Sequence, residues 1–348
     1  MNVSRAHLYN GTSLNAEIIS TGSESDDLLE EGRTLGETRT CAVPADAHGD
    51  RLDRVLVQLF PGFSRSYLQQ LVAGGAVQKD GAVLHKAATR LKAGDQLSVF
   101  LKPTLQAQAF APQSMPLDVV YEDADLLVIN KPAGLVVHPA AGNWSGTLLN
   151  GLLAYHPGAT QLPRAGIVHR LDKDTSGLML VAKSRAAFDG LVRAIAAREV
   201  SRRYLALAHG HWTGDSVRQV DQPIGRDARN RLRMAVVSPG QGKTAQTTFT
   251  ALDSNAQATA FLCRLHTGRT HQIRVHAAWM GHPLVADGLY GGHARWGLKR
   301  QALHAMRLDL EHPVSARPLG FEALPPEDLS DAMGFSGLHY NPGVFGEP

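Results

Sequence analysis

Cysteine is scarce in this chain, since its 348 residues include only Cys41 and Cys263. Two cysteines can form neither a disulfide framework nor a four-cysteine zinc site. Long apolar runs are also missing, because none approaches the roughly 18 residues that a membrane helix needs. The first residues, MNVSRAHLYNGTSLNAE, lack the apolar core of a secretory signal. We therefore expect a protein of the reducing cytoplasm that has no membrane segment.

The net charge is small, at +3, but it is unevenly distributed along the chain. Residues 1–40 contain seven acidic and three basic side chains, so the remainder carries a net charge of +7. A basic body points weakly toward a polyanionic partner, and charge alone favours an ordinary solvated surface. A hydrophobic content of 43% allows a sizeable core, and the length suggests about two domains.

The composition divides the chain into five segments. Residues 1–43 are rich in serine, threonine, glycine and acidic residues, which predicts a disordered acidic tail. A small unit over 44–102 is followed by a linker at 103–116 that is rich in proline, glutamine and alanine. A larger domain covers 117–325, and the proline and glycine turn signals of 326–348 predict a loose C-terminal tail.

The small unit has the pattern of two short helices followed by strands. Leu52, Val55, Leu56 and Leu59 recur at helical spacing, and Pro-Gly at 61–62 ends this helix. The Ser64 hydroxyl can cap a second helix, and the glycine pair at 74–75 ends that helix. A hairpin around 79–81 and a strand at 97–101 complete the unit. Between 50 and 102, eight basic and four acidic residues give a net charge of +4.

Apolar runs of strand length outnumber helical stretches in the larger domain and do not alternate with them strictly. This pattern predicts an α+β fold with a mixed, mostly antiparallel sheet rather than a doubly wound sheet. The predicted strands are 119–121, 126–129, 135–137, 178–181, 204–208, 247–252, 261–265 and 303–308. The predicted helices are 148–155, 185–199 and 270–280.

Two patterns that often indicate ligands are incomplete here. The sequence GQGKT at 240–244 resembles a phosphate-binding loop, but Val237 stands where the full pattern needs a glycine. We interpret it as a polar turn before a strand. The chain has 16 histidines, but His271 lies five residues from both His266 and His276. A zinc pair on one helix face needs a spacing of four, so no metal site is predicted.

The densest group of reactive side chains is the segment HRLDKDTSG at 169–177, which joins two predicted strand ends. A short loop on rigid strands is typical of a catalytic site, although a charged hairpin tip has the same composition. Asp172 and Asp174 lie two residues apart on this one loop. Glycoside hydrolysis needs carboxylates that flank the bond from opposite sides, so the pair fits that reaction poorly.

A second dense segment is TGRTHQIRVHAAWMG at 267–281. It places Arg269, His271 and Arg274 near the beginning of a predicted helix, where an unpaired cation opposes the helix dipole. The placement is easier to explain if an anion lies nearby, either Asp172 or a phosphate. A solvent-exposed basic turn is the alternative.

Taken together, these segments resemble the large-subunit ribosomal RNA pseudouridine synthases that carry an N-terminal S4 domain. The resemblance covers about 44–325, with FSRSYLQQLVAGGAV similar to an S4 domain. The blocks of the larger domain that carry it are VYEDADLLVINKPAGLVVHP, HRLDKDTSG, SRRYLALAHG, GRTHQIRVH, HPLVADGLYGG and QALHAMRLDLEHP.

The resemblance implies roles for five residues of the larger domain. Asp172 takes the place of the catalytic aspartate, and Arg170 would fill the space left by an extruded base. Tyr204 would stack on the target uracil and is a candidate proton acceptor. Arg274 would form an ion pair with Asp172, and Ile273 would pack behind it. In the S4-like unit, the expected RNA-binding residues are Arg51, Arg54, Arg65, Lys79 and Arg90.

The implied reaction is the isomerisation of uridine to pseudouridine, which needs no metal and no other cofactor. The implied partner is 23S ribosomal RNA or a large-subunit precursor, bound by a monomer at clustered uridines of a hairpin that faces the small subunit. Three alternatives remain open: a synthase for other 23S or transfer RNA uridines, a non-catalytic ribosome-assembly factor, and a hydrolase that uses Asp172 and Asp174.

Overall fold

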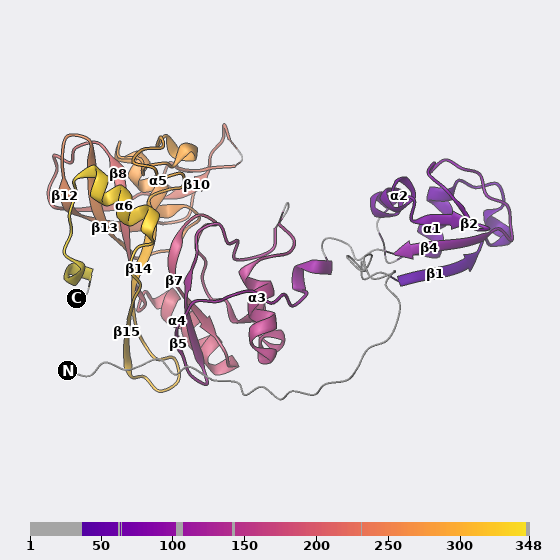
Figure 1. Cartoon of the computed structure of the whole chain (residues 1–348), viewed down its shortest axis with the longest axis horizontal. Helices are drawn as coiled ribbons and strands as arrows, with labels where there is room; N and C mark the ends of the chain where they lie inside the picture. Colours follow the sequence, from indigo (N-terminus) through magenta and orange to yellow (C-terminus); the bar gives the residue numbers. More distant parts are fainter. Residues whose placement is uncertain are drawn as a thin grey trace, which may run out of the picture. The chain divides into compact units, whose positions relative to one another are not determined.

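The computed structural model of the chain describes residues 37–345 apart from 62, 64, 102–106, 141–142 and 231. These residues form two compact units that divide between Pro103 and Thr104 (Figure 1). The predicted disorder of 1–36 and the predicted cap at position 64 lie outside the described residues.

The N-terminal unit is a small four-stranded sheet with two helices. Its sheet has the strand order β1-β4-β2-β3, and every pair is antiparallel. Its elements are β1 (Glu37–Ala42), α1 (Leu52–Leu59), α2 (Arg65–Ala73), β2 (Val77–Lys79), β3 (Ala82–Val83) and β4 (Gln96–Leu101). The predicted helices, hairpin and closing strand are all present. The buried side chains of α1 and α2 pack with Val77, Leu97 and Val99 to form the core of this unit.

Strand β1 lies where the sequence predicted a disordered tail, so that prediction is wrong for 37–43. The strand pairs with β4 over six residues, from Glu37 opposite Leu101 to Ala42 opposite Gln96. Only Cys41 among its side chains is even partly buried, so β1 has almost no apolar pattern. Its stability comes from main-chain pairing with a strand 54 residues or more away, which local sequence cannot show.

The larger unit is built on a nine-stranded mixed sheet. The strand order is β5-β6-β7-β14-β8-β13-β12-β9, and β15 pairs with β14. Its strands are β5 (Val119–Glu122), β6 (Leu126–Lys131), β7 (Ser176–Ala182), β8 (Ser201–His209), β9 (Val217–Asp221), β12 (Gln246–Ser254), β13 (Ala258–Leu265), β14 (Leu303–Glu311) and β15 (Pro318–Glu322). The pair β7 and β14 is parallel and the other pairs are antiparallel, which confirms the predicted α+β fold with a mostly antiparallel sheet. A separate hairpin joins β10 (Ile224–Arg226) to β11 (Met234–Val236).

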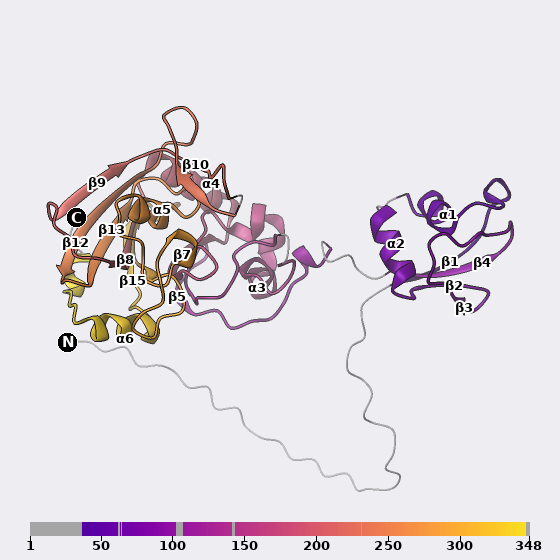
Figure 2. The ribbon, with the colours of Figure 1, turned by 90° about the horizontal axis from the view of Figure 1, so that it is seen from above.

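Helices cover both faces of this sheet (Figure 1, Figure 2). Helices α3 (Leu148–Tyr155) and α5 (Gln272–Trp279) pack on one face, while α4 (Arg185–Ala197) and α6 (Glu327–Ser336) pack on the other. The alternation along β8 sets this division: Tyr204 and Ala206 point to the α5 face, and Leu205 and Leu207 to the α6 face. None of the described helices combines the length and the apolar character that crossing a membrane requires.

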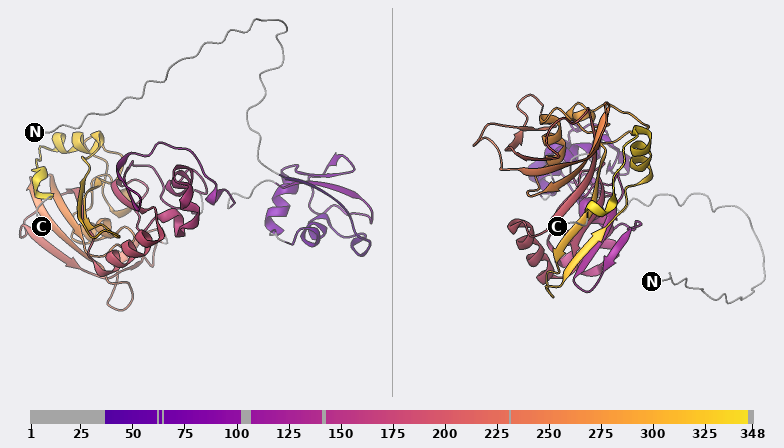
Figure 3. Two further views of the ribbon diagram at one scale, coloured as in Figure 1. Left: turned by 90° about the horizontal axis from the view of Figure 1, so that it is seen from below. Right: turned by 90° about the vertical axis from the view of Figure 1, so that its left-hand side faces the viewer.

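The described part of the predicted C-terminal tail, residues 326–345, is not loose, and its helix α6 lies beside the larger unit (Figure 3). Helix α6 buries Leu329, Ala332 and Met333 against β8 and β13, and Phe345 is fully buried in the same cluster. The apolar residues of this helix are regularly spaced. The helix is short, however, and lies between proline and glycine residues, and these turn signals led to the prediction of a tail. Pro326 begins the helix instead of breaking it, because proline is tolerated where no intrahelical N–H bond is needed.

Two further predictions differ from the structure. The second half of the predicted linker packs on the larger unit, where Asn150 on α3 donates hydrogen bonds to the carbonyls of Ala109 and Ala111. The predicted strand at 135–137 is irregular, because its carbonyls bind groups outside any sheet. The Leu135 carbonyl accepts a hydrogen bond from Lys131 Nζ, and the Val136 carbonyl accepts one from the Leu148 N–H.

Candidate active site

Asp172 lies on a short loop that leads into β7, where the sequence predicted it. The loop begins after Ile167, which makes a β-bridge to Val181, and it turns back through a hydrogen bond from Thr175 N to the Asp172 carbonyl. Gly177 allows the loop to end against the neighbouring strand. Its φ is +115°, and a Cβ there would stand 2.3 Å from the carbonyl oxygen of Ala305 on β14. A side chain at this position would push β7 away from β14.

A buried lysine ties this loop to β6. Lys131 is 1% exposed, and its Nζ donates hydrogen bonds to the carbonyls of Pro132, Leu135 and Lys173 at 2.8, 3.0 and 3.0 Å. Burial lowers the pKa of Lys131 to about 8, so the ammonium remains charged at neutral pH. This lysine is not among the predicted site residues. Its three bonds fix the main chain beside Asp172.

An arginine ties the other side of the loop to α6. Arg300 Nη1 donates to the Asp174 carbonyl at 3.1 Å, and its Nε and Nη2 form a bidentate pair with Asp328 at 2.6 and 2.8 Å. Gln301 Nε2 adds a hydrogen bond to the Thr175 hydroxyl. The loop that carries Asp172 is therefore held from two sides. Lys131 on β6 and Arg300 before β14 bind its carbonyls, and Gln301 binds the Thr175 side chain.

Arg274 from α5 joins two carboxylates. Its Nη1 lies 3.0 Å from Asp172 Oδ2, and its Nε and Nη2 lie 2.7 and 2.8 Å from the two oxygens of Asp287. The exposed fraction of the side chain is 17% for Asp172, 8% for Arg274 and 1% for Asp287. These charges raise the pKa of Arg274 despite its burial, so it is a permanent cation. The predicted pair of Arg274 and Asp172 is thus part of a triad.

Tyr290 and His271 complete the surroundings of Arg274. The Arg274 guanidinium lies 5.0 Å from the centroid of the Tyr290 ring, a cation–π distance. The Tyr290 hydroxyl accepts a hydrogen bond from Met234 N and lies 2.8 Å from His271 Nδ1, to which it can donate. When the hydroxyl donates, the proton of the imidazole is on Nε2, which is 3.8 Å from Asp172. Burial lowers the pKa of His271, so the ring is neutral at neutral pH.

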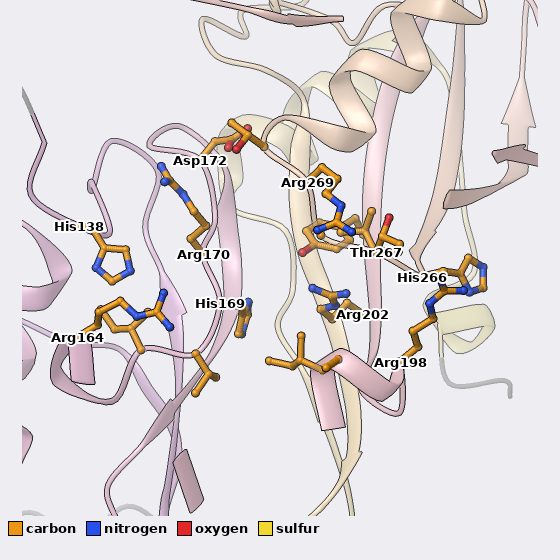
Figure 4. Close-up of a pocket in the computed structure, with 18 residues that line it drawn as sticks. His138, Arg164, His169, Arg170, Asp172, Arg198, Arg202, His266, Thr267 and Arg269 are labelled. Carbon is orange, nitrogen blue, oxygen red and sulfur yellow. The ribbon is translucent and has the colours of Figure 1, made fainter. Parts of the chain in front are cut away.

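Asp172 and Tyr204 both line a pocket of about 480 Å³ (Figure 4). Tyr204 is 4% exposed, and burial raises its pKa to about 12. Among the described residues, Asp172 is the only acidic side chain in the lining, which also contains five arginines: Arg164, Arg170, Arg198, Arg202 and Arg269. A pocket with one carboxylate and five guanidinium groups fits an anionic substrate.

The other two predicted residues of this site differ in exposure. Arg170 is exposed at the pocket and makes no side-chain hydrogen bond or ion pair with the described residues, so its guanidinium is available to a ligand. Ile273 is 3% exposed and belongs to the same core cluster as Leu171 and Tyr204.

The five predicted RNA-binding residues of the N-terminal unit all have partners within that unit. Arg51 and Arg65 bind Asp53, which is fully buried, at 3.1 and 2.8 Å, and these bonds lower the pKa of Asp53. Their side chains nevertheless remain 48% and 63% exposed. Arg54 lies 3.5 Å from Asp50. Lys79 pairs with Asp95 at 3.1 Å, and Arg90 donates to the Gly49 carbonyl at 2.7 Å.

Sequence reasoning missed Asp287, Tyr290 and Arg202. The first two belong to the block HPLVADGLYGG, which carried the family resemblance but received no role. Arg202 precedes the predicted strand at 204–208, in SRRYLALAHG. In the described part of the chain, no three His, Cys, Asp or Glu side chains are grouped as metal ligands. The GQGKT segment is a turn before β12, as predicted.

Comparisons with known proteins find relatives of both units. The family model described as RNA pseudouridylate synthase matches residues 125–279, and the S4 domain model matches 50–97. Ribosomal large subunit pseudouridine synthase D of Neisseria meningitidis serogroup B is 48% identical over 298 residues, which cover 82% of this chain and 79% of that protein. The protein of the same name from Yersinia pestis is 45% identical over 298 residues, with coverages of 82% and 90%. A solved structure, human RNA Pseudouridylate Synthase Domain Containing 1, is 29% identical with a TM-score of 0.49 and covers 62% of this chain and 86% of that one.

Proposed function

Because the chain belongs to the RNA pseudouridine synthase family of isomerases, we propose that it converts uridine to pseudouridine in 23S ribosomal RNA. The proposed targets are clustered uridines of a large-subunit hairpin that faces the small subunit, modified by a monomer in the cytoplasm. The names of the relatives support a ribosomal RNA substrate. The observation that carries the proposal is the ion pair of Asp172 with Arg274 in the pocket that also contains Tyr204.

The reaction exchanges one bond for another without oxidation or net hydrolysis. The bond between N1 of uracil and C1′ of ribose breaks, the base turns, and C5 bonds to C1′. The proton lost from C5 is balanced by one gained at N1. The Asp172 carboxylate either attacks C1′ as a nucleophile or assists a proton transfer at C2′. Both routes use the negative charge of this carboxylate, which the ion pair with Arg274 holds in place.

The target uridine must leave its stack before Asp172 can reach its sugar, at a cost of a few kcal/mol. In our proposal, the exposed guanidinium of Arg170 fills the space that the base leaves in the RNA. The Tyr204 ring stacks on the flipped uracil, which is worth about 1–3 kcal/mol. With a pKa of about 12, its hydroxyl stays protonated at neutral pH, which favours stacking over a role as base.

The first prediction separates these two roles of Tyr204. We expect Tyr204→Phe to bind RNA normally and to keep most of its pseudouridine formation, because the ring remains. Tyr204→Ala should weaken binding about tenfold to a hundredfold through the loss of stacking. Filter binding and single-turnover assays measure both effects. A complete loss of turnover in Tyr204→Phe, with binding intact, would identify the hydroxyl as an essential proton carrier.

The second prediction concerns the S4 domain, which we propose positions the RNA through phosphate contacts. Removal of residues 1–103 leaves the larger unit with its own core and should weaken RNA capture strongly while sparing turnover of a short, saturating substrate. The dependence of log affinity on log salt should become shallower, since fewer counterions are released. An affinity that is unchanged across the salt series would contradict this role. Charge reversal at Arg54, which is 76% exposed and weakly paired, tests it in the full chain.

Target identity is tested by mapping pseudouridine in ribosomal RNA from a strain that lacks this chain. Loss of pseudouridine at clustered positions of one large-subunit hairpin supports the proposal. Loss at other ribosomal or transfer RNA sites would show that those sites are the substrate and the hairpin is not. Purified protein that binds the RNA but forms no pseudouridine would instead indicate an assembly factor. Free uracil among the products would indicate a hydrolase.

A further inference from the structure

Arg202 is a buried cation without a partner among the residues that the structure describes. It lies on β8 two residues before Tyr204, so both side chains point to the same face of the sheet. It is 5% exposed, and its side chain makes no hydrogen bond or ion pair with any residue that the structure describes. Its buried Nε is among the few such atoms that lack an acceptor. Figure 4 shows its guanidinium in the middle of the pocket.

This arrangement is unfavourable for the protein alone. A guanidinium removed from water normally pairs with a carboxylate or carbonyl, because an unpaired buried charge loses its hydration without compensation. The adjacent Arg203 shows the usual solution. It is 6% exposed on the opposite face, and its Nη1 donates to the Phe345 carbonyl. The lack of a protein partner for Arg202 therefore points to a partner that the ligand supplies.

The surroundings of Arg202 select the chemistry of that partner. The guanidinium lies over the main chain of Gly268, where a Cβ would stand 2.8 Å from Nη1. A second buried group without a partner lines the same pocket: His169 Nε2 accepts a hydrogen bond from Leu180 N, which leaves Nδ1 as an unused donor. Arg198 and His266 also line this end of the pocket. The group therefore consists of donors and cations, which match the oxygens of an anion.

We propose that Arg202 binds a phosphodiester group of the RNA, immediately 5′ or 3′ of the uridine that Asp172 attacks. This inference rests on the proposed function, because Asp172 and Tyr204 line the same pocket and receive that uridine. The planar guanidinium can contact two phosphate oxygens at once, and His169 Nδ1 supplies a further donor. Binding of the phosphate at this point holds the flipped nucleotide by its backbone while Tyr204 holds its base.

The test combines a change in the protein with a change in the RNA. The proteins carry Asp172→Asn so that the RNA is not converted, and they have either Arg202 or Arg202→Met. The RNAs have an ordinary backbone or one uncharged methylphosphonate, 5′ or 3′ of the target uridine. With Arg202 present, one of the two methylphosphonates should weaken binding about tenfold to a hundredfold. On ordinary RNA, Arg202→Met should show an equal loss of affinity, and the same methylphosphonate should weaken its binding no further. The slope of log affinity against log salt should be smaller by about one for Arg202→Met.

Arg203→Met is the matched control, because it removes an equally buried guanidinium from the next residue of the same strand. It should lower the Tm, since it breaks the bond to Phe345, and it should keep the full methylphosphonate effect. Arg202→Met should have a Tm at or above that of the parent protein, because it removes an uncompensated charge. Arg202→Lys, which keeps the charge but loses the planar fork, should bind between the parent and Arg202→Met.

Three results would overturn the assignment. In the first, Arg202→Met binds ordinary RNA as tightly as the parent does. In the second, both methylphosphonates weaken the parent and Arg202→Met equally, which would place Arg202 on the base or the sugar. In the third, the Tm of Arg202→Met falls as far as that of Arg203→Met, which would show a structural role instead. Failure of the proposed function is distinguishable, because the protein with Asp172 intact would then form no pseudouridine in the same RNA.

Discussion

Replacement of Asp172 by asparagine is expected to lower single-turnover formation of pseudouridine by at least about a thousandfold, with RNA affinity nearly unchanged. In the parent, Arg274 Nη1 lies 3.0 Å from Asp172 Oδ2. Asparagine has the same shape as aspartate and can still accept this hydrogen bond. It has no negative charge, however, so it can neither attack C1′ nor take a proton from C2′. The assay is a time course on the target hairpin at saturating enzyme, beside an equilibrium binding curve.

Asp174→Asn is the matched control for this experiment, because it makes the same chemical change on the same loop. The Asp174 carbonyl accepts a hydrogen bond from Arg300, but its carboxylate forms no ion pair within the described residues. We expect its rate to stay within a few-fold of the parent. A hydrolase that used both carboxylates would lose activity in both variants. Substantial turnover by Asp172→Asn would remove Asp172 from the catalytic role.

The candidate site was predictable where its chemistry is local in sequence. The loop at 169–177 brings its reactive side chains together within nine residues, so neither the sheet nor the pocket was needed to identify it. Arg274 was predictable as a cation near a helix N-terminus that needs an anion. The expected anion was Asp172 or a phosphate, and the structure shows Asp172 together with a second carboxylate, that of Asp287. The second, Asp287, could not be inferred, because its approach to Arg274 depends on the turns after α5.

The fold was predictable where burial produces a periodic pattern. The strand at Leu126–Lys131 and the helix at Leu148–Tyr155 have such patterns and were both predicted. Strands β1 and β9 were missed, since they lie at sheet edges and bury at most one side chain well. Arg202 was missed for a different reason: a buried charge without a partner is visible only after the surrounding strands are in place.

The second large effect is expected from Asp287, which touches Arg274 and not the substrate. Asp287→Asn should lower kcat about a hundredfold and leave KM within a few-fold. With one fewer charge on its bidentate partner, Arg274 is no longer held in place, and a displacement of about 1 Å at a reacting group can cost a hundredfold in rate. Breaking a buried ion pair from one side costs about 3–5 kcal/mol of folding free energy, so the Tm should fall as well.

Asp328 offers the control, because it forms the same bidentate geometry with Arg300 but is 45% exposed. Asp328→Asn should change the folding free energy by no more than about 1 kcal/mol, since water screens and replaces an exposed pair. The two pairs have the same geometry and differ in burial. If burial decides how much an ion pair contributes to the free energy of unfolding, only Asp287→Asn loses stability. Its kcat, measured well below its own Tm, then decides whether Asp287 positions the catalytic machinery. A kcat equal to that of the parent in a folded Asp287→Asn would show that Asp172 alone is enough to hold Arg274.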